Sequence, residues 1–284
     1  MVKEKLIEKQ PFKGKIAVIP GGSKGMGRAT AKEFYMLGGS VCIIARGMDA
    51  LKSAEEEVKK LKTNNSQFVE IISCDTTDMD KLTPLLTDFI NKHGIPDYLF
   101  NFVGYAYAQY LEKLTLEDFK KNMDVNYYGQ LVPTLILLPY LMKAKSGYIS
   151  FTSSVSGYIG IMGYTTYTPP KFAILGLAEV LRNELKPYNV NISVLFPADV
   201  DTPGFAEENK LKPPECAIIS EAGKLMIPEQ IADIFIESIL KKKFEILPGK
   251  AKFLRKMKRL FPDLVRNITD SDYKKALKKT GRQI

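Results

Sequence analysis

Short apolar runs alternate with segments of helical spacing along most of this chain. The apolar runs lie at residues 16–19, 40–45, 68–73, 97–101, 147–152 and 190–196. Runs of this length between helical segments are typical of buried parallel strands, which are joined by right-handed helical crossovers. The pattern therefore predicts an α/β fold, with one Rossmann-type, doubly wound parallel sheet of about seven strands and helices on both faces.

Composition and charge divide the chain into two parts. Its 284 residues, 45% of them hydrophobic, can bury a large core, and no linker or internal repeat interrupts them. Residues 250–284 carry 12 Lys and Arg against 3 Asp, a net charge of +9 that equals that of the whole chain. We expect a reductase domain over residues 1–249, with a substrate-binding segment at about 199–227, and a basic helical extension over residues 250–284.

The basic extension has the spacing of an amphipathic helix. Apolar residues recur there at three- and four-residue steps among lysines and arginines; they are Phe253, Leu254, Met257, Leu260 and Phe261. Such a helix can lie on an anionic membrane surface, or it can pack its apolar face on its own domain. A contact with nucleic acid is a third alternative, but the neutral remainder of the chain argues against it.

Several other features restrict the class of protein. The first ten residues are too charged for a signal peptide, and no run of about 18 apolar residues occurs, so we expect a cytoplasmic protein. Cys42, Cys74 and Cys216 have no CxxC spacing and predict reduced thiols, with neither a disulfide nor a metal site. His93 is the only histidine and is expected to cap a helix C-terminus, which argues against a Ser-His-Asp hydrolase.

A glycine-rich turn follows the first apolar run and precedes good helix formers at residues 28–34. Its candidate cofactor-binding residues are Gly21, Ser23, Lys24, Gly25, Met26 and Gly27. Between a strand and a helix, such glycines permit a tight turn and let the backbone approach a pyrophosphate at the helix N-terminus. The stretch predicts a dinucleotide site, with an ordinary flexible turn as the alternative.

The end of the second predicted strand indicates which dinucleotide binds. NAD-binding folds commonly place Asp or Glu there, about 20 residues past the glycines, to hold the ribose 2'-hydroxyl. This chain has Arg46 instead, and Lys24 in the turn adds a second positive charge. A guanidinium binds phosphate in a bidentate way, so the pair predicts NADPH as the cofactor. The alternative is that Arg46 is a solvated strand end.

Ser154, Tyr167 and Lys171 are candidate catalytic residues. Tyr167 and Lys171 have the i, i+4 spacing that places both on one helix face. Because a tyrosine hydroxyl has a pKa of about 10, it needs a neighbouring positive charge to release its proton readily near neutral pH. Ser154 can donate to a substrate oxygen while Tyr167 protonates it. The spacing of Tyr167 and Lys171 taken alone would also fit a surface helix.

Together these motifs resemble the classical short-chain dehydrogenases/reductases over roughly residues 12–245. The resemblance rests on the glycine-rich turn, Asn101 and Gly104 after a predicted strand, Asn126, Ser154, Tyr167 and Lys171. It implies that Tyr167 is the general acid, that Lys171 lowers its pKa and binds the nicotinamide ribose, and that Ser154 polarises the substrate. Asn126 would keep a helix locally open to hold a proton-relay water.

The same resemblance implies further contacts. Asp75 would contact the adenine ring, Asn101 would steady the central sheet, and Thr202 would lie near the nicotinamide carboxamide. The remaining cofactor contacts expected by resemblance are Gly104, Pro197 and Val200.

Three positions depart from the family pattern, and a pair of prolines also needs comment. Pro20 replaces Thr before the first glycine, Phe102 replaces a second Asn, and Ala198 follows Pro197 where Gly is usual. Pro20 lacks the N–H and hydroxyl that normally brace the turn. The pair Pro169-Pro170 between the tyrosine and the lysine requires the helix to begin close to Tyr167.

Residues 199–210, just past the sixth predicted strand, resemble a subfamily, the 3-ketodihydrosphingosine reductases. This resemblance implies NADPH-dependent reduction of the 3-keto group of a long-chain sphingoid base, with location at the cytosolic face of a membrane (endoplasmic reticulum if eukaryotic). Glu207 or Glu208 could meet the ammonium of such a substrate, or both could be solvated loop charges. Reduction of another apolar ketone, such as a 3-oxoacyl chain or a steroid, is the alternative activity. A non-enzymatic nucleotide sensor is the third hypothesis.

Two predicted helices, at residues 131–142 and 172–185, carry more apolar surface than one sheet face needs to cover. Related enzymes often pair these helices between subunits. We therefore expect a homodimer or homotetramer.

Overall fold

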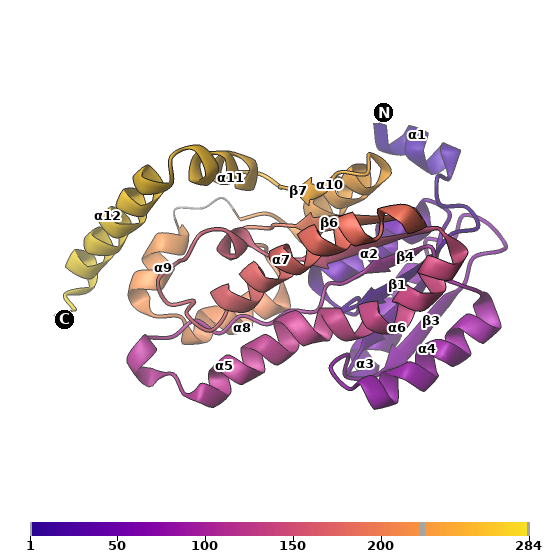
Figure 1. The fold of residues 1–284 in the computed structure, drawn as a ribbon, viewed down its shortest axis with the longest axis horizontal. Helices are drawn as coiled ribbons and strands as arrows, with labels where there is room; N and C mark the ends of the chain where they lie inside the picture. Colours follow the sequence, from indigo (N-terminus) through magenta and orange to yellow (C-terminus); the bar gives the residue numbers. More distant parts are fainter. Residues whose placement is uncertain (1, 222–224, 283–284) are drawn as a thin grey trace.

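Seven parallel strands form one twisted sheet in the order β3-β2-β1-β4-β5-β6-β7 (Figure 1). The computed structural model describes residues 2–221 and 225–282; residue 1, residues 222–224 of the expected substrate-binding segment and residues 283–284 of the extension lie outside the described part. The strands are β1 (Ile16–Pro20), β2 (Ser40–Ala45), β3 (Val69–Ser73), β4 (Tyr98–Phe100), β5 (Gly147–Thr152), β6 (Val190–Leu195) and β7 (Glu245–Ile246). The predicted sheet is confirmed, and the two-residue β7 is the strand that no apolar run located.

Helices cover both faces of the sheet, as predicted. On one face lie α2 (Gly25–Met36), α3 (Met48–Lys59) and α10 (Pro228–Leu240); on the other lie α4 (Met79–His93), α6 (Gly129–Ala144) and α7 (Thr168–Glu184). Strand β1 contributes side chains to both layers: Ala17 and Ile19 pack on the side of α2, and Val18 packs on the side of α6. This two-sided burial explains why the strands are continuous apolar runs.

Several short helices and turns connect these elements or lie at the edge of the fold. They are α1 (Val2–Lys9), α5 (Leu116–Met123), the 3-10 turns η1 (Leu111–Lys113), η3 (Val155–Gly157) and η4 (Lys186–Tyr188), and a π-helical turn η2 (Asp124–Tyr128) that joins α5 to α6. Helix α4 ends at His93 as predicted, but the imidazole does not cap it. Instead the ring contacts the Glu70 carboxylate at 2.5 Å and stacks on Phe68.

Helix α7 begins where its two prolines require. Tyr167 is the N-cap residue, and Pro169 and Pro170 fall in the first turn, where the missing N–H groups would have no helical partner. This confirms the predicted helix start.

The expected substrate-binding segment is largely helical. It holds α8 (Pro203–Leu211) and α9 (Pro214–Glu221). Thr202 caps α8 by accepting from Phe205 N at 3.1 Å, and Pro203 occupies the first turn. A short bridge between Val200 and Met226 joins the two ends of the segment to one another at its base. The segment therefore projects as a flap beyond the end of β6.

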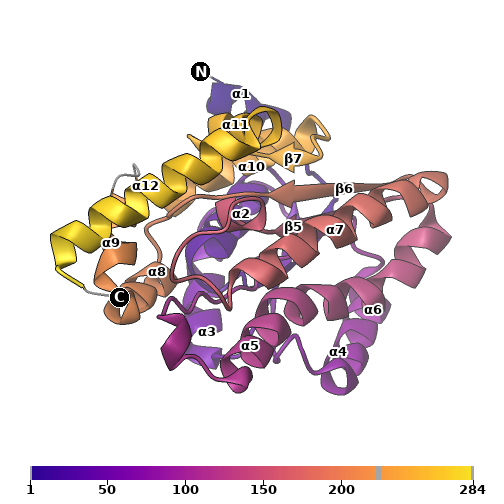
Figure 2. The same cartoon turned by 60° about the vertical axis from the view of Figure 1, so that its left-hand side comes forward.

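The basic extension forms α11 (Ala251–Leu260) and α12 (Pro262–Thr280), which run across the end of the molecule beside α9 (Figure 2). Ala251, Val265 and Ala276 are buried against the domain, so one face of the extension packs on it. Large apolar side chains of the extension also remain exposed, and two of them, Phe253 and Ile268, line the cavity described below; the exposed ones are Phe253, Leu260, Phe261, Leu264 and Ile268. Within residues 2–221 and 225–282, no helix is both long enough and apolar enough to cross a membrane.

Candidate active site

A single cavity of about 1810 Å³ runs along the carboxyl ends of the strands. It extends from the glycine-rich turn, past Ser154 and Tyr167, to apolar side chains of α8, α9, α11 and α12. In this fold, ligands bind at that edge because the strand order reverses there between β1 and β4. The cavity brings together every predicted site residue except Asn101 and Asn126, which lie behind its wall.

The glycine-rich turn is shaped for close approach of a ligand to the backbone. Gly21 has φ +79°, and a Cβ on it would lie 2.6 Å from the carbonyl carbon of Phe102. A Cβ on Gly27 would lie 2.4 Å from the carbonyl oxygen of Gly21. No side chain caps α2 at Lys24, so the first N–H groups of this helix are available to an anion. These features fit a dinucleotide pyrophosphate.

The turn keeps its bracing although Pro20 has no N–H. Gly21 N donates to Ile44 O at 2.8 Å, and Phe102 N donates to Pro20 O at 2.8 Å. The turn is thus tied to β2 on one side and to the end of β4 on the other. Phe102, another departure from the family pattern, is buried edge-on against Phe235 with ring centroids 5.3 Å apart.

Arg46 and Asp75 lie together at the end of the cavity next to β2 and β3. Their side chains approach to 3.8 Å, and the Arg46 side chain is 76% exposed. Asp75 accepts from Thr77 N at 3.0 Å, which leaves its second carboxylate oxygen facing Arg46. Lys24 lines the same cavity. Arg46 and Lys24 thus line the cavity at the end of β2, and the largely exposed guanidinium lies beside the Asp75 carboxylate.

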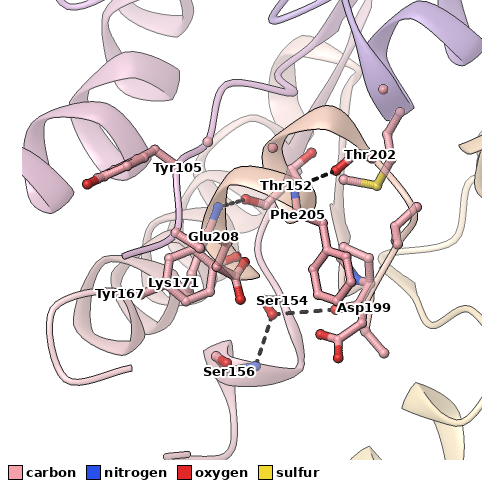
Figure 3. Close-up of a pocket in the computed structure, with 18 of the residues that line it drawn as sticks. Tyr105, Thr152, Ser154, Ser156, Tyr167, Lys171, Asp199, Thr202, Phe205 and Glu208 are labelled. Carbon is pink, nitrogen blue, oxygen red and sulfur yellow. Dashed lines mark hydrogen bonds between the residues drawn. The ribbon is translucent and has the colours of Figure 1, made fainter. Parts of the chain in front are cut away.

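Ser154, Tyr167 and Lys171 meet at the centre of the cavity (Figure 3). Ser154 follows β5, and its Oγ accepts from Ser156 N at 3.1 Å. Lys171 is buried one turn after Tyr167, with its Nζ 5.3 Å from the tyrosine ring centroid and donating to Thr152 O at 3.0 Å. The three side chains come from one strand end and one helix start, which fixes their spacing.

Burial dominates the protonation of this group. It raises the pKa of Tyr167 well above its usual value, and nearby Glu208 raises it further, while a hydrogen bond with Ser154 opposes the shift. Burial also lowers the pKa of Lys171 to about 7. The net shift of the tyrosine pKa is upward, because burial outweighs the hydrogen bond with Ser154. Tyr167 is therefore held as the protonated acid.

Asn126 lies in the π-helical turn η2, where the helix is locally open as the resemblance implied. Its side chain holds the backbone of Tyr105 through two hydrogen bonds, to Tyr105 O at 2.7 Å and from Tyr105 N at 3.1 Å. A water at this turn stays a prediction. Asn101 is buried between β4 and α6, and its Nδ2 donates to Thr134 Oγ1 at 3.4 Å. That position fits its expected role in the sheet.

Gln130 is a buried polar residue that the sequence reasoning missed. Its Nε2 donates to Asn126 O and Thr152 O, each at 2.9 Å, and its Oε1 accepts from Thr152 N at 2.8 Å. It therefore joins η2 to the end of β5, at the carbonyl that also receives Lys171. The available signal was a glutamine at the start of the otherwise apolar segment at residues 131–142.

A second polar group at the substrate end was only partly anticipated. Glu208 of α8 pairs with Lys212 at 2.9 Å, and Tyr164 donates its hydroxyl hydrogen to the same carboxylate. Asp199 follows β6 and lies close enough to Glu208 and Lys212 for them to affect its ionisation. Burial raises the pKa of Asp199, and Lys212 opposes that shift. Glu207 instead pairs with Lys210, and its side chain is 71% exposed. The structure thus separates the two glutamates that the sequence left as alternatives.

The sheet order, the glycine turn and the Ser-Tyr-Lys group define an oxidoreductase of the Rossmann class. The family model of short chain dehydrogenases matches residues 15–212, and the chain belongs to this family, whose members use a nicotinamide cofactor. Among relatives, a 3-dehydrosphinganine reductase of Danio rerio is 40% identical over 84% of this chain and 73% of its own length. A 3-ketodihydrosphingosine reductase of Mus musculus is 37% identical, over 85% of this chain and 73% of its own.

Solved structures share the fold. A short chain dehydrogenase/reductase from Burkholderia phymatum, in complex with NAD, superposes with a TM-score of 0.75 at 23% identity, covering 86% of this chain and 92% of its own. A 3-oxoacyl-[acyl-carrier protein] reductase from Brucella melitensis with bound NAD has a TM-score of 0.68 at 25% identity, covering 80% and 84%. At such identities the likeness establishes the architecture.

Proposed function

We propose that this protein is an NADPH-dependent ketoreductase that converts 3-ketodihydrosphingosine to dihydrosphingosine. The observation that best supports this proposal is one continuous cavity, which extends from the glycine-rich turn to Tyr167 and then to apolar walls. Beyond Tyr167, the cavity is lined by apolar side chains that suit a long alkyl chain, including Ile159, Leu211, Leu254 and Met257. Relatives named for this reaction include proteins that are 40% and 34% identical, over 84% and 83% of the chain.

The chain's own residues supply the acid and orient the ketone. When bound, the nicotinamide would provide the hydride for the carbonyl carbon. Tyr167 is protonated and would donate its hydrogen to the carbonyl oxygen as negative charge develops there. Ser154 would donate a second hydrogen bond to that oxygen, because its hydroxyl lies beside the tyrosine. Lys171, anchored on Thr152 O, would return a proton to the phenolate after each turnover.

The reaction is tested by mixing the protein with 3-ketodihydrosphingosine and NADPH and following the loss of reduced-nicotinamide absorbance. We expect turnover that falls by more than about a thousandfold in Tyr167→Phe, because the general acid is lost. Tyr188→Phe, a tyrosine in η4 at the far edge of the sheet, is the matched control and should retain activity. Turnover of other apolar ketones with none of this substrate would refute the proposed activity.

We further propose that Arg46 and Lys24 select NADPH over NADH. They line the adenosine end of the cavity, and no acidic side chain follows β2 until Asp49. Arg46→Ala should reduce kcat/KM for NADPH by about tenfold to a hundredfold, the value of a charge-assisted hydrogen bond, and leave NADH almost unaffected. Equal effects on both cofactors would show that Arg46 does not read the 2'-phosphate.

The basic extension is proposed to rest on an anionic membrane surface. Phe253 is 65% exposed, and Leu260 is also exposed on the same side of α11. Basic side chains surround them: Lys252, Lys256 and Arg259 are exposed as well. Helix α11 also lines the cavity, through Phe253, Leu254 and Met257, so an apolar substrate would pass directly from the surface to the site.

Sedimentation with lipid vesicles tests this placement. The protein should bind vesicles containing phosphatidylserine more strongly than pure phosphatidylcholine vesicles, and raised salt should weaken the binding. Phe253→Ser combined with Leu260→Ser should abolish it. Ile95→Ser, at an exposed apolar residue after α4, is the control and should bind normally. Equal binding by both variants would remove α11 as the contact.

We also propose that α6 and α7 mediate a homodimer or homotetramer. Leu135, Phe172 and Val180 on their outer faces are each more than 40% exposed. Light scattering after size exclusion should give a multiple of 31.9 kDa for the native chain and a monomer for Val180→Arg. A native monomer would contradict the proposal.

A further inference from the structure

Two carboxylates share one lysine at the substrate end of the cavity. Glu208 and Lys212 form an ion pair at 2.9 Å, and their side chains are 10% and 1% exposed. Asp199 adds a second carboxylate that Lys212 also neighbours. With both acids ionised, the group carries one negative charge more than its lysine neutralises. A buried charge of this kind is unfavourable without a partner.

The group lies beside the reacting atoms. Tyr164, whose hydroxyl donates to Glu208, has its ring centroid 5.8 Å from that of Tyr167. Glu208 and Asp199 both act electrostatically on the Tyr167 hydroxyl, and Figure 3 shows the Glu208 carboxylate beside Tyr167 and Asp199 on the other side of Ser154. A ketone whose oxygen meets Tyr167 therefore brings its nearest substituents up to these carboxylates.

We propose that Glu208, assisted by Asp199, binds the ammonium group on the carbon next to the ketone and so selects amino ketones. This inference rests on the proposed function and deepens it. Lys212 neutralises only one of the two carboxylates. The substrate ammonium neutralises the second, so the buried group and its bound ammonium have no net charge. The alkyl chain then extends from the other side of the carbonyl toward α11, along the apolar wall.

The immediate neighbour Glu207 provides a matched comparison. Both residues belong to α8, but Glu207 pairs with Lys210 and its side chain is largely exposed. Neutralising Glu207 removes the same formal charge from the same helix without touching the buried group. A general change in helix stability or net charge would therefore affect the two variants alike, whereas ammonium binding requires only Glu208.

The test compares two long-chain ketones that differ only in the ammonium group, with NADPH as the cofactor. For the native chain and each variant, kcat/KM is measured for both ketones, and their ratio is the amine preference. In Glu208→Gln the preference should fall by about tenfold to a hundredfold, mainly through KM for the amino ketone. In Glu207→Gln the preference should equal that of the native chain.

A second variant guards against failure to fold. Glu208→Gln leaves Asp199 as the remaining carboxylate near Lys212, so the triple variant Glu208→Gln, Asp199→Asn, Lys212→Met removes all three charges together. It should melt close to the native temperature and show the same loss of amine preference. An unchanged preference in either folded variant overturns the inference while leaving the proposed reaction standing. Failure of the native chain to reduce the amino ketone at all would overturn both.

Discussion

Replacing Lys171 with methionine should make the protein more stable while abolishing its activity. Lys171 is 2% exposed, and burial lowers its pKa to about 7 from an ordinary value of 10.5. The folded state therefore disfavours the charged ammonium of Lys171. We attribute the presence of a lysine at this buried position to the chemistry beside Tyr167. Methionine has a similar shape and no charge to bury, so Lys171→Met removes the unfavourable term.

The magnitude follows from the two pKa values. Because the folded-state pKa lies below the unfolded one, the unfolded chain binds more protons between pH 7 and 10.5. The native chain's stability should therefore rise with pH across that window. At pH 7 the lowered pKa of Lys171 reduces the free energy of unfolding by at most about 4 kcal/mol, and about 3 kcal/mol of this loss disappears by pH 9.5. The lost hydrogen bond to Thr152 O offsets about 1 kcal/mol of the gain from methionine.

Urea unfolding at pH 7 and pH 9.5 measures this difference, followed by far-UV circular dichroism because the chain has no tryptophan. Lys171→Met should exceed the native free energy of unfolding at pH 7, and the excess should shrink by up to about 3 kcal/mol at pH 9.5. Lys143→Met, at an exposed lysine of α6, should show no such pH-dependent excess. If native and Lys171→Met stabilities change in parallel with pH, the lysine pKa is not lowered and the reasoning fails.

Three further substitutions follow from the local surroundings of single residues. Gly27→Ala should destabilise the fold by at least about 2 kcal/mol and weaken cofactor binding, because its Cβ would meet Gly21 O. Gly176→Ala in α7, where the added Cβ meets nothing within 4 Å, should instead raise the melting temperature. Gln130→Leu should lower the unfolding free energy by about 2 kcal/mol, measured in urea, by leaving Thr152 N without its partner. A normal kcat in that folded variant would show that this bridge does not position Lys171.

Most of the sheet could be predicted because each buried parallel strand is encoded within its own few residues. Five residues at β1 and six at β2 are nearly all apolar, since helices cover both faces. Strand β7 could not be located in this way. Its two residues, Glu245 and Ile246, pair with the edge of β6, and Glu245 faces Arg255 of α11 rather than the core. Its strand conformation depends on neighbours that its own sequence does not indicate.

The catalytic residues were predictable for a similar reason. Tyr167 and Lys171 share one helix, and the glycine turn is continuous in sequence, so short-range spacing defines their geometry. The direction of the tyrosine pKa was not predictable, because it depends on how deeply the fold buries both side chains. The sequence could not distinguish Glu208 from Glu207, since the difference depends on how α8 packs against Tyr164.

The geometry of α11 is compatible with both main alternatives for the basic extension. Phe253 and Leu254 are consecutive residues, so their side chains leave a helix about 100° apart and cannot share one narrow contact. The apolar arc of this helix is therefore wider than packing on the domain can cover. Leu254 packs on the core and lines the cavity, and Phe253, which also lines the cavity, is 65% exposed among lysines. Packing on the domain therefore leaves part of the apolar surface of α11 exposed, which supports the proposed contact with a membrane surface.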